Sequence, residues 1–207
     1  MASPSNDRLV WIDCEMTGLN PEVDVLVEVA VVITDYDLNV LHPGVDLVIK
    51  PPQAALDSMG DFVRDMHTTS GLITELDSGM SLEEAQSVLL DYVKNYVPEA
   101  GVAPLAGNTV GTDRMFLQKE LPLLHEHLHY RNIDVSTVKE LSKHWYPKSY
   151  FHSPDKKGGH RALADILESI RELAYYRQAV FVDAPGPETT AVKKIRESIT
   201  DEWAEHL

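Results

Sequence analysis

The sequence contains a single cysteine, Cys14, so the chain cannot form an internal disulfide, and it lacks the thiolates that a cysteine-based metal site needs. No apolar run approaches the ~18 residues of a membrane-spanning helix. The N-terminal residues MASPSNDR carry no apolar stretch typical of a secretory leader. We therefore expect a soluble protein of a reducing, cytoplasmic compartment with no membrane partner.

Basic residues are scarce: 18 Lys and Arg stand against 33 Asp and Glu, a formal net charge of −15. A body of this charge repels long polyanions and leaves no broad basic track for a duplex. Any contact with nucleic acid should be short and aided by cations. By itself, an acidic balance does no more than keep a protein soluble.

Length and composition fit one globular domain, or one domain with an appendage: 207 residues, 43% hydrophobic and 25% charged. The first part is β-rich, with strands expected at 9–15, 25–34 and 45–50. A turn at 35–39 joins the last two strands as a hairpin, and the prolines at 51 and 52 end the third.

Helices then alternate with strands. A short, imperfect helix is expected at 57–69, and clearer helices at 81–97, where Ser81 and Glu84 form a capping box, and at 162–178. Strands are expected at 102–106 and 131–135, and a loop at 148–159. Shorter helices should begin at Thr112, at Pro122 and at either Ser136 or Thr137, the last one running to Trp145. This order predicts an α/β fold, a mixed five-stranded sheet flanked by helices.

The chain changes character after Asp183. Pro185 to Pro187 form the expected hinge, and 189–207 fits a separate amphipathic helix or a mobile tail. We therefore expect a domain at 1–184 and a C-terminal tail at 185–207.

Two acids, Asp13 and Glu15, lie near the end of the first expected strand. Because side chains alternate along a strand, both face one side, with Cα atoms about 7 Å apart, while Val10, Ile12 and Cys14 face the core. Neighbouring carboxylates repel each other and lose solvation on burial, costs that a hard divalent cation such as Mg²⁺ offsets. A strand end that emerges into solvent, with both acids hydrated, explains this segment equally well.

A third acid, Asp113, follows the glycine-bearing segment that begins at Gly107 and opens an expected helix. Glycine lets a backbone approach a ligand closely. The first turn of a helix favours an anion through the helix dipole. The dipole alone is reason enough for an acid here, so this segment by itself indicates structure.

A fourth acid, Asp165, follows His160 on the last expected long helix. The apolar stripe of that helix consists of Leu163, Ile166, Leu167, Ile170, Leu173 and Ala174. Asp165 lies off the centre of this stripe, so alone it is a solvated helix residue. His160 alone is a surface histidine, although histidine accepts protons near neutral pH.

Taken together, these acids indicate more than each does alone. Acids at the end of a first strand, at the start of a mid-chain helix and on the last core helix can converge at one end of a sheet. Such a cluster is the arrangement that a two-cation phosphoryl-transfer site needs.

The three segments resemble the motifs of the DEDDh exonuclease superfamily, which has a ribonuclease H-like fold, and most closely those of its oligoribonuclease family. The matching segments are WIDCEMTGL at 11–19, GNTVGTDRMFL at 107–117 and HRALADILESIRELAYY at 160–176. The resemblance implies a 3′-to-5′ exoribonuclease that hydrolyses short oligoribonucleotides, dinucleotides above all, to 5′-nucleoside monophosphates.

The resemblance also implies roles by motif position. Asp13, Glu15, Asp113 and Asp165 would bind two divalent cations, Mg²⁺ or Mn²⁺, with Asp13 shared by both ions. His160 would be the general base that takes a proton from the attacking water.

Substrate contacts are implied in the same way. Leu19 and Phe62 would grip the bases, and Phe62 stands where many relatives carry Trp; base stacking is worth about 1–3 kcal/mol per base. The segment HYRNIDVST at 129–137 implies a homodimer in which Tyr130 reaches the partner's active site. The remaining implied contacts are His67, Thr109, and, toward the 5′ phosphate, Arg131, Ser136 and Lys139.

Three alternatives remain at this point. The chain could be another DEDDh exonuclease that acts on longer RNA or single-stranded DNA. It could be a noncatalytic nucleic-acid binding module on the same fold. It could also be an acidic α/β scaffold with a protein partner, for which the sequence offers nothing specific.

Overall fold

The computed structural model describes residues 7–156, 158–204 and 206. The N-terminal residues 1–6, in which no leader was expected from the sequence, residue 157 of the expected loop and residues 205 and 207 of the tail lie outside the described residues. A five-stranded sheet has the order β3-β2-β1-β4-β5, and its strands are β1 (Arg8–Met16), β2 (Leu26–Asp35), β3 (Val45–Val48), β4 (Pro104–Gly107) and β5 (His129–Asp134). The predicted mixed sheet is confirmed.

Pairing within the sheet changes direction at β1. This strand runs antiparallel to β2, and β2 antiparallel to β3, while β1, β4 and β5 run parallel to one another. The carboxyl ends of β1, β4 and β5 therefore meet at one edge of the sheet, where parallel strands of open α/β sheets carry their ligand sites.

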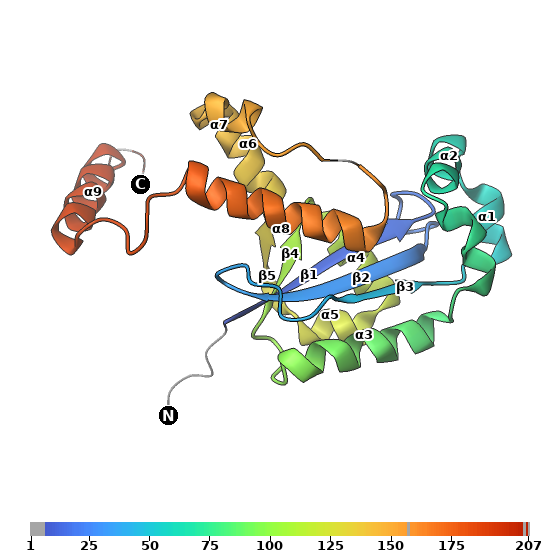
Figure 1. The fold of residues 1–207 in the computed structure, drawn as a ribbon. Coiled ribbons are helices and arrows are strands. Elements are labelled where there is room, and N and C mark those ends of the chain that lie inside the picture. Colours follow the sequence, from blue (N-terminus) through green and yellow to red (C-terminus); the bar gives the residue numbers. More distant parts are fainter. Residues whose placement is uncertain (1–6, 157, 205, 207) are drawn as a thin grey trace.

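Helices cover both faces of the sheet (Figure 1). On one side lie α3 (Leu82–Tyr96), α4 (Val110–Glu120) and α5 (Pro122–His127), and on the other α6 (Val135–Trp145) and α8 (Ala162–Ala179). The short helices α1 (Gln53–Ser58) and α2 (Asp61–Thr69) and the 3-10 turns η1 (Leu72–Thr74) and η2 (Leu76–Ser78) lie at one end of the sheet in Figure 1.

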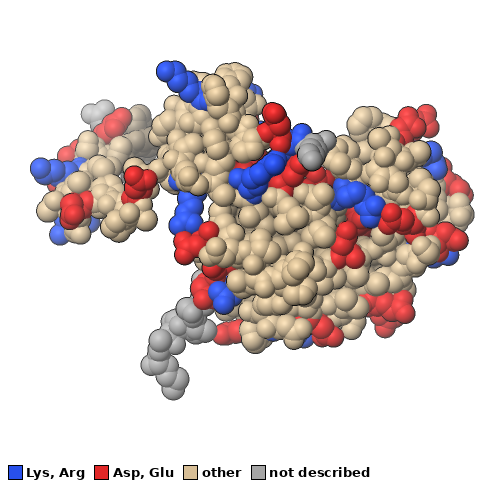
Figure 2. Space-filling model, in the orientation of Figure 1, with Lys and Arg blue, Asp and Glu red and all other residues tan. Residues whose placement is uncertain are grey.

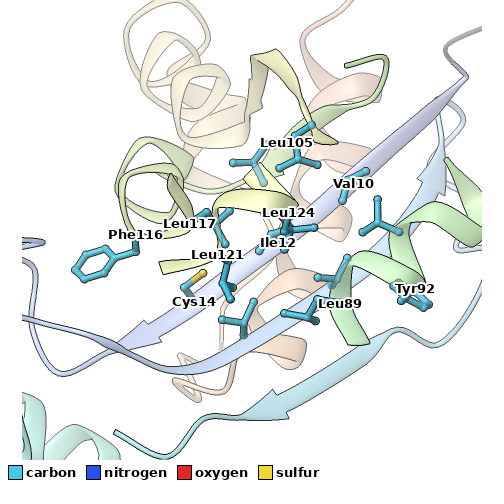
Figure 3. Close-up of a cluster of buried hydrophobic side chains, with 14 of the residues drawn as sticks. Val10, Ile12, Cys14, Leu89, Tyr92, Leu105, Phe116, Leu117, Leu121 and Leu124 are labelled. Carbon is cyan, nitrogen blue, oxygen red and sulfur yellow. The ribbon is translucent and has the colours of Figure 1, made fainter. Parts of the chain in front are cut away.

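The first strand is buried on both of its faces. Val10, Ile12 and Cys14 pack with residues of α3, α4 and α5, as Figure 3 shows, and Leu9 and Trp11 pack against α8. Burying one large apolar side chain contributes about 1.5–3 kcal/mol. Trp11 also donates its indole N–H to Thr34 Oγ1 at 2.8 Å. The strand that carries Asp13 and Glu15 is therefore fixed by hydrophobic packing on both faces of the sheet.

Several predicted boundaries were wrong. The expected helix at 57–69 is two helices, α1 and α2, because the chain is extended at Met59 and Gly60. The expected loop at 148–159 begins inside a short helix, α7 (Pro147–Phe151), with Pro147 in its first turn. Leu167 was placed in the apolar stripe of α8, but its side chain is 46% exposed.

Two predicted helix caps were also wrong. α4 begins at Val110, not after Thr112, and its N-cap is Thr109 in the left-handed conformation with φ 56°. α6 is capped by Asp134, whose side chain accepts a hydrogen bond from the Ser136 N–H at 3.1 Å, and not by Ser136 or Thr137. The capping box that starts α3 is confirmed, since the Ser81 and Glu84 side chains each accept from the other's backbone N–H.

The C-terminal segment forms α9 (Thr189–Glu202), which has no buried residue and lies apart from the layered body in Figure 1. Its exposed apolar side chains, Val192, Ile195 and Ile199, follow helical spacing. Among the described residues, none of the helices is apolar over enough length to cross a bilayer.

Candidate active site

Four acids and one histidine line a single cavity of about 450 Å³ at the carboxyl edge of the parallel strands. Asp13 and Glu15 come from β1, Asp113 from α4, Asp165 from α8, and His160 from the residues just before α8. The sequence separates the first and last of them by about 150 positions, and the sheet topology brings them together.

On β1, Asp13 is half-buried and Glu15 is buried. Burial, together with the nearby carboxylates of Asp165 and Glu28, raises the pKa of Glu15 to about 8. Burial, followed by the charges of Asp113 and Glu15, raises the pKa of Asp13 well above its ordinary value. These acids therefore do not lie at a hydrated strand end.

Asp113 is tied directly to β1. Its Oδ1 accepts a hydrogen bond from the backbone N–H of Cys14 at 3.0 Å, and its side chain is 6% exposed. Burial raises the pKa of Asp113 to about 7, and the Cys14 N–H acts in the opposite direction. The acid therefore does more than complement a helix dipole, because its carboxylate reaches across to the strand.

Asp165 and His160 complete the cluster from the start of α8. Asp165 is half-buried in the cavity wall rather than solvated, and burial raises its pKa. One ligand atom from each of Glu15, His160 and Asp165 lies within 4.8 Å of the others. These three side chains come from two elements and form one group of potential metal ligands.

The four carboxylates lack basic partners: within the described part of the chain, no Lys or Arg forms an ion pair with any of them. Buried carboxylates without a partner are costly, which is why they tend to hold protons. Carboxylate oxygens are the ligands that hard divalent cations prefer. The donor set therefore fits such cations.

Leu19 and Phe62 lie next to the acids. Leu19 is 74% exposed and Phe62 is 82% exposed, and both line a second, smaller cavity of about 230 Å³ that shares Glu15 with the first. The turn before Leu19 needs glycine, because a Cβ on Gly18 would collide with the carboxylate of Asp24. That carboxylate also accepts from the Thr17 hydroxyl at 2.9 Å, which fixes the turn.

His67 does not line the acidic cavity in the structure. Its side chain is fully buried behind Glu15, with Nε2 donating to the Met16 carbonyl at 2.9 Å and Nδ1 at 4.0 Å from Glu15 Oε2. Burial lowers the pKa of His67, which favours the neutral ring. His67 therefore lies beside Glu15 in the protein interior rather than in the wall of the acidic cavity.

Thr109, Ser136 and Lys139 belong to a polar network beside the cavity. Thr109 lines the cavity, and its hydroxyl lies 3.0 Å from that of Ser136. Lys139 forms an ion pair with the buried Glu172 at 3.1 Å. These side chains lie along the side of the cavity formed by the starts of α4 and α6.

Tyr130 and Arg131 are not brought to this chain's cavity. Both lie on β5, the edge strand, where Tyr130 is 74% exposed and the Arg131 guanidinium lies 5.5 Å from the centre of its ring. Both side chains are exposed on the edge strand.

Sequence reasoning missed several residues at the site. Asn108, Lys156 and Ser169 line the cavity with the acids. Asn108 and Ser169 lie within the quoted motif segments but were given no role, and Lys156 lies in the expected loop, outside those segments. Glu28 is different, because a lone acid inside the β-branched run 25–34 is itself unusual in a buried strand. That signal was present in the sequence.

Comparisons with known proteins agree with this geometry. Residues 10–173 match the profile of the RNase T family, described as exonucleases. An oligoribonuclease of Leifsonia xyli subsp. xyli is 62% identical over 203 residues, covering 98% of each chain. An oligoribonuclease of Streptomyces coelicolor is 57% identical over 190 residues, covering 92% of this chain and 95% of that protein.

Solved structures share the fold at low identity. Exonuclease I from Methylocaldum szegediense aligns with a TM-score of 0.58 at 19% identity, over 84% of this chain and 41% of that one. E. coli exonuclease I in complex with a dA16 oligonucleotide aligns with a TM-score of 0.63 at 14% identity, again over 84% and 41%. The present chain thus spans less than half the length of these structures.

The sheet, its flanking helices and the acidic cavity define a nuclease, a hydrolase with a ribonuclease H-like fold. With the family profile covering most of the sequence and curated relatives above half identity over nearly all of it, the chain belongs to the RNase T exonuclease family and, within it, to the oligoribonucleases.

Proposed function

We propose that the protein is a 3′-to-5′ exoribonuclease that hydrolyses short oligoribonucleotides, dinucleotides above all, and releases 5′-nucleoside monophosphates. The observation that carries the proposal is the convergence of Asp13, Glu15, Asp113, Asp165 and His160 on one cavity. The oligoribonuclease relatives supply the substrate class.

The four acids would hold two divalent cations, Mg²⁺ or Mn²⁺. Their formal charge of −4, if all are ionised, matches two dications, and their raised pKa values fit a site that is balanced only when cations are bound. When bound, the cations would supply positive charge at the scissile phosphate, which the protein body does not offer.

His160 would act as the general base. Its ring borders the cavity and lies within reach of Glu15 and Asp165, where a water that attacks the phosphate would be held. A general base positioned in this way contributes about 10²–10⁴-fold to the rate. We therefore expect His160→Ala to reduce kcat by that range.

The shape and charge around the site support the proposed preference for short substrates. Leu19 and Phe62 stand at the mouth of the cavity and can stack on bases, while Thr109, Ser136 and Lys139 can take the 5′ phosphate. The net charge of −15 opposes long RNA elsewhere on the surface. In Figure 2, acidic side chains are spread over much of the visible face.

The test is incubation of 5′-labelled dinucleotide RNA with the protein, with and without chelator. Release of labelled mononucleotide that stops with chelator supports the proposal. Absence of hydrolysis under all conditions would favour a noncatalytic binding module. A series of RNA and DNA lengths separates the proposed enzyme from an exonuclease of longer substrates, because the latter would cleave a 20-mer as well as a dinucleotide.

The proposed enzyme is a homodimer in which Tyr130 completes the partner's site. The exposure of Tyr130 on an edge strand, away from its own cavity, supports this arrangement. Mixing inactive Tyr130→Ala with inactive Asp13→Asn should restore activity, because one site of each mixed dimer then has both residues. If the mixture stays inactive while the two variants demonstrably associate, the shared-site arrangement is wrong.

We also propose a cytoplasmic location. The lone cysteine, Cys14, is free and buried, which fits a reducing compartment. Fractionation of cells expressing the natural protein tests this point, and recovery in a membrane or secreted fraction contradicts it.

A further inference from the structure

His160 occupies an unusual backbone position. Its φ is 49°, and that of Gly158 is 59°, so the chain enters the left-handed region twice just before α8. A side chain other than glycine adopts this conformation only where its surroundings determine it. The glycines at 158 and 159 add freedom on the N-terminal side. What fixes His160 must therefore lie largely on its C-terminal side.

Packing around the ring contributes little. His160 is exposed and borders two cavities, the acidic one of about 450 Å³ and another of about 590 Å³ that faces α2. A side chain between two cavities has few neighbours to hold it. Its position over Glu15 and Asp165 must be set through the backbone.

The next residue, Arg161, is anchored at three points. Its Nε donates to Glu28 Oε1 at 2.8 Å, and its two terminal nitrogens donate to the two oxygens of Glu75 at 2.9 and 3.0 Å. Such a two-pronged pairing restricts orientation as well as distance, because the guanidinium is planar. Arg161 is thus fixed between β2 and the η1–η2 turns.

Glu28 anchors the helix as well. Its second oxygen, Oε2, accepts the backbone N–H of Ala162 at 2.9 Å, so a strand residue caps the first turn of α8. The Glu28 side chain is fully buried, and both of its oxygens are used. Charged groups persist in a protein interior when they are paired and hydrogen-bonded in this way.

The hydrogen bonds of Glu28 also tie the start of α8 to β1, the strand that carries Asp13 and Glu15. Glu28 on β2 lies opposite Glu15 on β1 in the antiparallel register. One carboxylate therefore fixes the start of α8 relative to the strand that carries two of the site acids. Figure 2 shows Lys and Arg side chains next to Asp and Glu over this end of α8.

We propose that Arg161 and Glu28 are positioning residues for the hydrolysis. Their hydrogen bonds hold the backbone so that the His160 ring lies close to Glu15 and Asp165. Glu75 assists by pairing with the other side of the Arg161 guanidinium. The inference rests on the proposed role of His160 as general base. Neither residue touches the substrate, so both act through His160. Loss of the hydrogen bonds that the Arg161 guanidinium makes to Glu28 and Glu75 should reduce the rate of the chemical step and leave binding of the dinucleotide almost unchanged.

The test is a double-mutant cycle that uses Arg161→Lys, His160→Ala and the double variant in the full chain. Lysine keeps the positive charge but cannot make the paired hydrogen bonds of the planar guanidinium. We therefore expect kcat to fall about 10-fold or more and KM to change less than about 2-fold. In the His160→Ala background, Arg161→Lys should cause no further fall in kcat. Glu75→Gln, at an exposed position, should give a smaller decrease of the same kind.

Arg177→Lys is the matched control. Arg177 lies near the C-terminal end of α8, the helix that Arg161 precedes, and its guanidinium pairs with Asp37 at 2.8 Å, where neither residue lines the cavity. It should leave kcat and KM unchanged. If Arg161→Lys has the same effect with and without His160, or matches Arg177→Lys, the positioning role is overturned. If His160→Ala alone retains full activity, the base assignment fails instead, and that outcome is distinct.

Discussion

Two groups of buried carboxylates lie close together in this molecule and differ in what surrounds them. Asp13, Glu15 and Asp113 line one cavity, none of them forms an ion pair with a Lys or Arg among the described residues, and their pKa values are raised. Glu28 is fully buried but bound by Arg161, and Glu172, 2% exposed, is bound by two lysines. The second group is neutralised by its own partners, whereas the first has no Lys or Arg ion pair in the part of the chain that the structure describes.

Glu172 makes the contrast plain. It is as buried as Asp113, yet hydrogen bonds and charges from Lys156 and Lys139 lower its pKa below the ordinary value, against the effect of burial. Burial is the largest cause of the raised pKa values at the cavity, and at Glu172 the two lysines outweigh the same effect. Because no described Lys or Arg forms an ion pair with the acids of the cavity, we propose that divalent cations complete the site.

The largest expected effect comes from removing one unpaired acid. Asp13→Asn should reduce hydrolysis of a dinucleotide by at least about 10³-fold, because several kcal/mol of charge stabilisation through the cations are lost. Its melting temperature without metal should rise, because one repelling carboxylate is gone. Asp57→Asn, an exposed acid bonded to Gln53, is the control and should change neither quantity. Retained activity in Asp13→Asn would remove this acid from the site.

The pH dependence of stability should also distinguish the unpaired acids of the cavity from the paired ones. Glu15 and Asp113 have folded-state pKa values of about 8 and about 7, above the ordinary values of 4.5 and 3.8. Raised carboxyl pKa values stabilise the fold below the unfolded-state pKa, and this contribution is lost as pH rises through the folded-state pKa.

We therefore expect the melting temperature in chelator to fall between about pH 5 and pH 8, and Mg²⁺ to reverse the fall. A change of 1 kcal/mol corresponds to about 2–4 °C for a chain of this size, which a thermal melt resolves. A melting temperature that is flat over this range with chelator, or unaffected by Mg²⁺ at pH 8, would contradict the account.

The paired group should respond with the opposite sign. Glu172→Gln keeps the shape but removes the charge that Lys139 and Lys156 share, so the free energy of unfolding should fall by about 1–2 kcal/mol. Both lysines are partly exposed and can turn to water, which keeps the loss moderate. Chemical denaturation measures the change. A stabilised Glu172→Gln protein would show that the two groups do not differ as described.

The smallest effect is expected from the tail. α9 buries none of its residues, so a chain that ends at Ala184 should melt within a few degrees of the full chain and retain its activity. Calorimetry and the dinucleotide assay check this prediction. A large loss of stability or of dimer would show that the tail is part of the folded or assembled unit after all.

Much of this architecture could be predicted from the sequence, because strand alternation and helix periodicity are local signals. β1, β2 and α8 have nearly the predicted limits. The caps of α4 and α6 were missed because Thr109 adopts a left-handed backbone conformation and Asp134 caps from within a strand, which residue type alone does not reveal.

At the site, the sequence pattern singled out the four acids and the motif resemblance implied their roles, whereas their burial and contacts could be seen only in the structure. Asp165 alone looks solvated, and only the packing of α8 against β1 and β2 shows that it faces the cavity. The bond between Arg161 and Glu28 joins residues 133 positions apart, so no local pattern could predict it. Long-range pairing of this kind depends on the folded sheet.

The central claim is that the unpaired acids need divalent cations, and titration calorimetry with Mn²⁺ on metal-free protein tests it most directly. We predict that about two Mn²⁺ ions bind per chain, and that Asp13→Asn loses at least one of them while Asp57→Asn binds both. Binding of no Mn²⁺ by the unaltered chain, or equal uptake by Asp13→Asn, would contradict the account.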